Sequence, residues 1–162
     1  MELADIRALP FHHRVVIPDE YLDIFQHMNV QYYLRIFSDS VFRMFADIGM
    51  DDTFFQEHQI GLYAVDQRLS YRAEVKASET VAVYSRFIMR SSKSLHFMVF
   101  MVNETQGVLS ATMEALAFHV DRTTKKSAPF LTEIAMHIDD RLAVDQALSW
   151  AVPLSKAIHV GL

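Results

Sequence analysis

The fold is decided by the stretch Asp23-Ile24-Phe25-Gln26-His27-Met28-Asn29-Val30-Gln31-Tyr32-Tyr33, in which a polar loop leads directly into a long apolar segment. From residue 29 to residue 48, polar residues recur every three or four positions and form one narrow stripe. This spacing predicts a helix over about residues 29–48 that is largely wrapped by the rest of the chain. Asn29 is a good N-cap residue, and Gly49 suits the left-handed conformation that ends many helices.

Five further segments carry the pattern of β-strands. Alternating or continuous apolar residues predict strands at about residues 11–17, 61–72, 81–90, 95–102 and 108–120. The last four follow one another through short connections, which predicts a meander of mainly antiparallel strands. A single curved sheet around the helix satisfies both the apolar helix and the one-sided strands. The expected fold class is α+β, with one long central helix wrapped by a curved, mainly antiparallel five-stranded sheet.

The rest of the chain carries weaker patterns. Short or weakly amphipathic helices are expected at residues 1–9, 51–58 and 132–148, and residues 150–162 are unassigned. There are no internal repeats and no linkers. At 162 residues the chain is long enough for one domain and short for two. We therefore expect a single domain, residues 1–162, with a core at about 11–125 and a C-terminal extension at about 126–162.

Composition excludes several classes of protein. Hydrophobic residues make up 51% of the chain, whereas Gly and Pro number four each, which is typical of a globular protein. Cysteine is absent, which excludes a disulfide framework and a cysteine nucleophile and fits a cytoplasmic location. A formal charge of -5 disfavours nucleic acid as a partner. No segment approaches the roughly 18 apolar residues of a membrane span, so no membrane partner is expected.

The loop before the helix has a plausible chemistry. Free amides and the positive end of the helix dipole can hold a developing oxyanion, and the carboxylate of Asp23 beside them can attack a carbonyl or activate water. The alternative is that Asp23 and His27 are ordinary solvated loop residues. No serine lies in a nucleophile elbow. Because the adjacent His12 and His13 point to opposite faces of a strand, and the other histidines lack ligand spacing, no metal is expected.

The stretch Asp23-Ile24-Phe25-Gln26-His27-Met28-Asn29, followed by Tyr33, resembles the hotdog-fold acyl-CoA thioesterases of the 4-hydroxybenzoyl-CoA thioesterase type. That family carries an aspartate, a short spacer, Gly-His-x-Asn, and a helix with an early tyrosine. The resemblance covers about residues 11–125 and implies hydrolysis of an acyl-CoA thioester, without a cofactor. Two positions depart from the family pattern. Gln26 replaces a glycine, which predicts a different path of the turn, and Val30 replaces a second asparagine.

The resemblance also implies roles for single residues. Asp23 would be the catalytic nucleophile or general base, and amides near Val30 to Tyr33 would hold the oxyanion. The substrate-binding residues implied are His27, Asn29, Val30, Tyr32 and Tyr33. His27 is expected to shape the loop or contact the substrate rather than act as the base. The alternative function is a catalytically silent hotdog protein that binds an acyl ligand or a partner.

The sequence and the resemblance together also predict the kind of substrate and the oligomeric state. Basic turns that can meet the phosphates of coenzyme A contain Arg90, Lys93, Arg122, Lys125 and Lys126. The acyl group is expected to be small, aryl or betainyl. The pair Tyr32-Tyr33, the dipeptide Leu95-His96 and the stretch from Ser110 to Asp121 also resemble a hotdog subgroup associated with betainyl-CoA, and aromatic faces bind trimethylammonium groups well. Long sheet edges, and active sites that the family builds between protomers, imply a homodimer or homotetramer.

Overall fold

The computed structural model describes residues 1–160. The chain divides into two compact units. Unit 1 contains residues 1–43, 69–85 and 99–113, and unit 2 contains residues 44–68, 86–98 and the chain from residue 114 onward.

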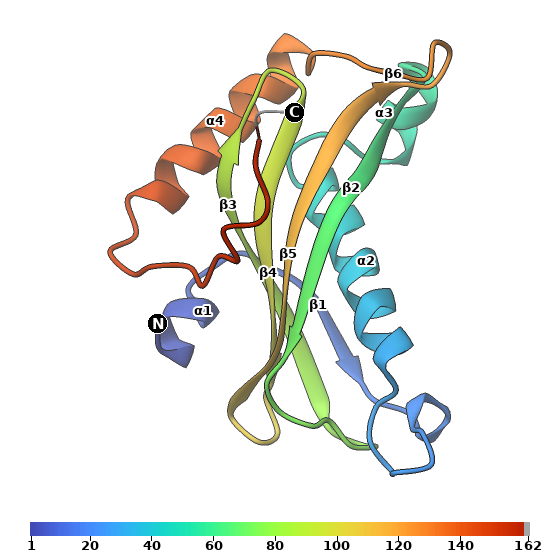
Figure 1. The fold of residues 1–162 in the computed structure, drawn as a ribbon, viewed down its shortest axis with the longest axis vertical. Coiled ribbons are helices and arrows are strands. Elements are labelled where there is room, and N and C mark those ends of the chain that lie inside the picture. The colour runs from blue at the N-terminus through green and yellow to red at the C-terminus, as the bar shows by residue number, and fades with distance from the viewer. Residues whose placement is uncertain (161–162) are drawn as a thin grey trace. The chain divides into compact units, whose positions relative to one another are not determined.

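Helices and strands occur where the sequence predicted them. Their order is α1 (Leu3–Arg7), β1 (Phe11–Val16), η1 (Asp19–Tyr21), α2 (Val30–Ala46), α3 (Asp52–Glu57), β2 (Ile60–Tyr71), β3 (Thr80–Arg90), β4 (Ser94–Asn103), β5 (Val108–Asp121), β6 (Lys126–Ser127) and α4 (Thr132–Gln146) (Figure 1). The short η1 and β6 had no clear signal in the sequence. Within residues 1–160, no helix is long and apolar enough to cross a membrane.

Helix α2 begins and ends as its capping residues predict. The side chain of Asn29 accepts a hydrogen bond from the amide of Gln31 at 3.1 Å, which confirms Asn29 as the N-cap. Gly49 follows the helix with a φ of 91°, the left-handed conformation that a side chain disfavours. Both ends of α2 are therefore fixed by residues close to them in sequence.

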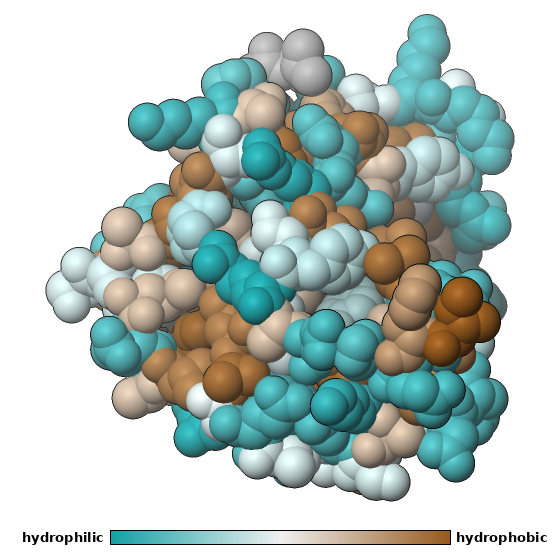
Figure 2. Space-filling model, turned by 60° about the horizontal axis from the view of Figure 1, so that its bottom comes forward, coloured by the Kyte–Doolittle hydropathy of each residue, from teal (hydrophilic) through white to brown (hydrophobic). Residues whose placement is uncertain are grey.

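The expectation that α2 is wrapped on most sides is wrong for one face. Val30, Leu34 and Phe42 are 61%, 40% and 63% exposed, although all three are apolar positions of the predicted helix. On the face of the molecule drawn in Figure 2, hydrophobic side chains gather in patches between hydrophilic ones. Periodicity identifies apolar positions, but it does not say whether the same chain covers them.

The sheet has the strand order β1-β3-β4-β5-β2, with β6 paired to β5. Strand β1 is antiparallel to β3, with His13 opposite Val83 and Val16 opposite Thr80. Strand β2 is antiparallel to β5, because its start and end bond in opposite order along β5: the amide of Arg122 donates to Gln59, and the amide of Arg72 donates to Ser110. The predicted antiparallel sheet is confirmed, with all five predicted strands present.

The predicted meander is wrong at its first strand, because β2 lies at the sheet edge beside β5 and does not pair with β3. Exposure explains the difference. All ten residues of β4 are buried, and most of β3 and β5 are buried too, whereas β2 is exposed along most of its length. A strand with polar residues facing water is suited to an edge, and strands that are apolar on both faces are suited to the middle.

The C-terminal extension is a packed part of unit 2, in which α4 runs beside β3 (Figure 1). Asp145 of α4 accepts a hydrogen bond from the amide of Phe87 at 2.8 Å. The guanidinium of Arg86 donates to the carbonyl oxygen of Trp150 at 2.8 Å and lies 4.3 Å from the centre of its ring. Farther along, the amide of Ser155 donates to Glu114 at 2.8 Å. Polar contacts therefore hold the extension against the end of β3 and against β5.

Candidate active site

The turn that carries Asp23 is closed by its own main chain. The amide of Asp23 donates to the carbonyl oxygen of His27 at 2.9 Å, and the amide of Gln26 donates to that of Asp23 at 3.0 Å. Gln26 adopts a φ of 62°, in the left-handed region that glycine enters freely. The prediction that Gln26 would change the path of the turn is therefore wrong. Glutamine accepts the positive φ at a cost of about 1–2 kcal/mol.

The carboxylate of Asp23 is held by one of its two oxygens. Oδ1 accepts a hydrogen bond from the amide of Phe25 at 2.8 Å and a longer one from the amide of His27 at 3.5 Å. Within residues 1–160, no group hydrogen-bonds to the other oxygen, Oδ2. The side chain is partly exposed, so Oδ2 is available to a water molecule or a substrate.

The first turn of α2 offers fewer free amides than the sequence predicted. The amide of Gln31 bonds to the side chain of Asn29, and the amide of Tyr32 bonds to the carbonyl oxygen of Asn29 at 3.0 Å. The amide of Val30 makes no hydrogen bond in the described part of the chain. An amide without a partner at the start of a helix can hold an oxyanion, and the amide of Val30 has this position.

A hollow of about 390 Å³ lies beside this turn in unit 1. It is lined by residues from the turn and the start of α2, from the end of β2 and from the connection after β2, namely His27, Met28, Val30, Tyr33, Tyr71, Arg72, Ala73 and Glu74. The rings of Tyr33 and Tyr71 meet edge to face with centroids 5.1 Å apart. Burial, followed by the charges of Tyr71 and Glu74, raises the pKa of Tyr33 to about 12. Tyr33 is therefore an uncharged phenol at neutral pH.

Three of the five predicted substrate-binding residues line the hollow, namely His27, Val30 and Tyr33. The other two have structural partners. Asn29 caps α2, and the ring of Tyr32 stacks on Tyr21 with centroids 3.8 Å apart. These contacts account for Asn29 and Tyr32 without a substrate.

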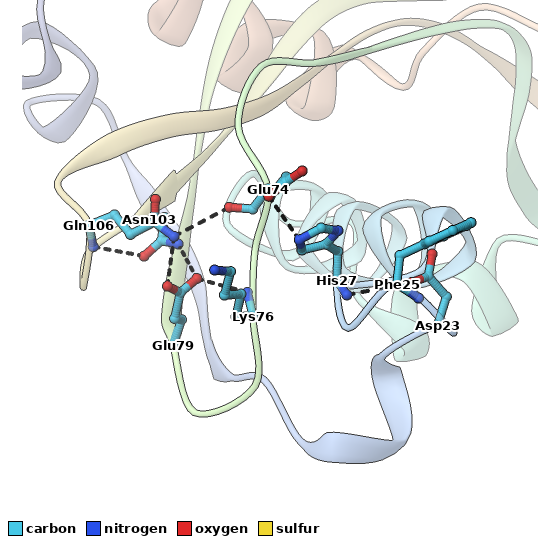
Figure 3. Close-up of polar contacts among 8 residues, drawn as sticks. All are labelled: Asp23, Phe25, His27, Glu74, Lys76, Glu79, Asn103 and Gln106. Carbon is cyan, nitrogen blue, oxygen red and sulfur yellow. Dashed lines mark hydrogen bonds and ion pairs between the residues drawn. The ribbon is translucent and has the colours of Figure 1, made fainter.

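The lining residues that sequence reasoning missed are Met28, Tyr71 at the end of β2, and three residues of the connection between β2 and β3. Glu74 lies in this connection, and its Oε2 is 2.8 Å from Nε2 of His27 (Figure 3). Arg72 and Ala73 are held to β5, because both of their amides donate to the carbonyl oxygen of Ser110. No local pattern marks these residues as part of a site. They reach the site because the chain passes from β2, on one side of β5, to β3, on the other side. Only the strand order shows this crossing.

The basic residues predicted to meet coenzyme A all belong to unit 2. The guanidinium of Arg90 is engaged by Asp139, with Nε 2.6 Å from Oδ1 and a second bond from Nη2 to Oδ2. Arg122 and Lys125 are exposed in the turn between β5 and β6, and Lys126 is exposed at the start of β6. The amide of His119 donates to the carbonyl oxygen of Lys93 at 2.9 Å, which brings the turn of Lys93 alongside the end of β5.

Metal-binding side chains do not cluster in the part of the chain that the structure describes, where no group of three or more His, Asp or Glu residues could hold an ion. Single histidines have other partners. His12 lies 2.7 Å from the hydroxyl of Ser85, and His96 lies 3.0 Å from Oε1 of Glu114. Each is a buried pair made with a neighbouring strand.

Comparison with known proteins assigns the family. Residues 16–138, more than half of the chain, match the thioesterase-like superfamily. The chain belongs to the thioesterase-like superfamily. This membership confirms the expected class of enzyme, a thioester hydrolase.

Individual relatives of this thioesterase-like protein agree with the assignment. It is 26% identical over 133 residues to the betainyl-CoA thioesterase of Pseudomonas aeruginosa, covering 82% of this chain and 83% of that protein. A hypothetical protein from Staphylococcus aureus, solved in complex with CoA, superposes with a TM-score of 0.81 at 21% identity and covers 88% of this chain and 90% of its own. A putative thioesterase from Pseudomonas putida gives 0.77 at 19% identity, with coverages of 93% and 96%. The two structures confirm the α+β hotdog fold.

Proposed function

We propose that this thioesterase-like protein hydrolyses acyl-CoA thioesters and that Asp23 is its catalytic carboxylate. The observation that supports the proposal is that a carboxylate oxygen in the turn before α2 and an amide at the start of α2 are both without a hydrogen-bond partner within residues 1–160. These are Oδ2 of Asp23 and the N–H of Val30. A general base beside an oxyanion donor is the arrangement that hydrolysis of a thioester carbonyl requires.

In the proposed reaction, Oδ2 of Asp23 takes a proton from water while the water oxygen bonds to the thioester carbon. The carbonyl oxygen becomes an oxyanion, which the amide of Val30 and the positive end of the α2 dipole stabilise. The carbon–sulfur bond then breaks, and the leaving thiolate receives the proton from Asp23. In the alternative route, Asp23 itself attacks the carbon and water hydrolyses the resulting anhydride. In the second route, water that attacks the aspartyl carbon of the anhydride leaves its oxygen on Asp23, so ¹⁸O in Asp23 after a single turnover in labelled water identifies that route.

We propose that the acyl group enters the hollow lined by Tyr33 and Tyr71. Two aromatic rings form an apolar wall, and their faces attract a quaternary ammonium group. The relative from Pseudomonas aeruginosa is named a betainyl-CoA thioesterase, so betainyl-CoA is the first ester to test among small acyl and aryl esters. For the phosphates of coenzyme A, Lys93, Arg122, Lys125 and Lys126 are better candidates than Arg90, since Asp139 already neutralises Arg90.

We further propose a homodimer, with a homotetramer as the larger alternative. Strand β2 leaves one edge of the sheet open for its twelve residues, and Val30, Leu34 and Phe42 expose apolar surface on α2. A second copy can cover both kinds of surface. Light scattering at micromolar concentration is expected to give at least twice the mass of the chain, and a monomer alone contradicts this assembly.

The proposed activity is tested with acetyl-, benzoyl-, 4-hydroxybenzoyl- and betainyl-CoA, by measuring free thiol with a colorimetric reagent. We expect release well above background for at least one ester. If none is hydrolysed while equilibrium dialysis still detects binding of CoA esters, the protein is the catalytically silent binder that the sequence left as the alternative.

A further inference from the structure

The turn of Asp23 is joined to the connection between β2 and β3 by two adjacent contacts within unit 1. The imidazole of His27 meets the carboxylate of Glu74 at 2.8 Å, and the amide of Met28 donates to the carbonyl oxygen of Val75 at 2.7 Å. Val75 is fully buried, which fixes the main chain beside Glu74. One side-chain contact and one main-chain contact therefore tie the turn to two consecutive residues of the connection, Glu74 and Val75.

The connection that carries Glu74 is also held by hydrogen bonds on the side that does not face His27. The carboxylate of Glu79 accepts hydrogen bonds from the amide of Lys76 at 2.8 Å, from Asn103 at 2.7 Å and from Gln106 at 2.6 Å (Figure 3). The side chain of Gln106 also reaches the carbonyl oxygen of Glu74 at 3.5 Å. These hydrogen bonds tie the connection to the turn between β4 and β5, so the main chain that carries Glu74 is held on both sides of its contact with His27.

We propose that Glu74 is a positioning residue for thioester hydrolysis, which acts by holding His27 and, through His27, the catalytic turn. This inference rests on the proposed function. His27 is the link because its imidazole meets Glu74 while its amide points at Oδ1 of Asp23, at 3.5 Å. A movement of His27 therefore changes the surroundings of the Asp23 carboxylate.

The contact also sets the chemistry of the imidazole. A neutral histidine carries a proton on one nitrogen and accepts at the other. Because a carboxylate only accepts, Nε2 carries the proton that it donates to Glu74, and Nδ1 takes no part in this contact. His27 lines the hollow with its side chain 32% exposed, so the contact with Glu74 holds the ring in the orientation that it presents to the hollow. Glu74 is 64% exposed and remains accessible to solvent.

A double-mutant cycle of Glu74→Ala and His27→Ala tests the inference, on the CoA ester that the wild type hydrolyses fastest. We expect Glu74→Ala to lower kcat about fivefold to tenfold with KM within about twofold. In the His27→Ala background, the same change should cost nothing further, because the group that Glu74 positions is already absent. Glu74→Gln retains an oxygen that accepts from Nε2 and should recover most of the lost kcat.

The matched control is Glu104→Ala, which removes a carboxylate from another ion pair of unit 1, made with Arg14 at 2.7 Å and outside the hollow. It should leave kcat unchanged. Two results would show that Glu74 contacts the substrate directly and would overturn the inference. In the first, the two substitutions lower kcat by factors that multiply in the double mutant. In the second, Glu74→Ala raises KM and leaves kcat unchanged. Wild-type kcat in Glu74→Ala would overturn it as well.

Hydrogen exchange separates this inference from the proposed function, since it requires no turnover. We expect Glu74→Ala to speed exchange of the amides in residues 22–29 and to leave residues 104–108 unchanged. If the wild type hydrolyses no CoA ester, the proposed function fails. The hydrogen-exchange rates of residues 22–29 then still test whether Glu74 orders the turn. Unchanged exchange in residues 22–29 overturns the inference whatever the activity.

Discussion

Replacing Asp23 with asparagine removes the proposed base while sparing the turn. The amide oxygen of asparagine can still accept the hydrogen bond that Phe25 donates at 2.8 Å, so the local structure is retained. Replacing an ionised acceptor with a neutral one weakens this bond by about 1 kcal/mol. For a chain of this size, that loss lowers Tm by about 2–4 °C.

The effect on the reaction is expected to be much larger than the effect on stability. The asparagine amide cannot take a proton from water or attack as a carboxylate. General acid–base catalysis contributes about 10²–10⁴-fold, so kcat should fall at least about a hundredfold, which corresponds to about 2.7 kcal/mol of transition-state stabilisation. KM should change little, since Asp23 does not line the hollow.

Thiol release with the best CoA ester measures the loss, and circular dichroism confirms the fold. Asp19→Asn is the matched control, because it makes the same change four residues earlier, at an exposed position in η1. It should retain full activity. If Asp23→Asn keeps kcat within about threefold of the wild type, the carboxylate is not the base, and His27 becomes the next candidate.

Three further predictions concern stability and titration. Gln26→Gly should stabilise the protein by up to about 1 kcal/mol, because φ is 62° and the side chain is exposed; an unchanged or lower midpoint in chemical denaturation would contradict this. Tyr33 should remain protonated up to a pKa of about 12, so that stability falls as pH rises from about 10 toward 12; near-ultraviolet titration of wild type against Tyr33→Phe measures this ionisation. Burial acts to raise the pKa of Glu79, but hydrogen bonds from Lys76, Gln106 and Asn103 outweigh it and lower the pKa. The Glu79 carboxylate therefore stabilises the fold above the unfolded pKa of about 4.3 and loses this effect as pH falls through the lower folded value, so the Tm difference between wild type and Glu79→Gln should shrink in acid.

The elements that the sequence determined by itself are those fixed by neighbours along the chain. Asn29 and Gly49 mark the ends of α2 because an N-cap bond and a left-handed residue are local events. The turn from Asp23 to His27 is local in the same way, since its hydrogen bonds span four residues or fewer. Sequence reasoning could therefore identify Asp23, His27 and the helix start as one candidate site.

What tertiary structure alone decided is which distant segments meet. The alternating pattern of β2 identified a strand but not its partner, and pairing with β5 sends the next connection to the turn of Asp23. Glu74 consequently reaches His27 across 47 residues of sequence (74 − 27), a contact that no local pattern encodes. The exposed face of α2 follows the same rule, because periodicity shows which positions are apolar and only the folded chain shows which of them it covers. Hydrogen bonds between residues close in sequence can be predicted from those residues alone, whereas strand order and burial depend on the packing of the whole chain.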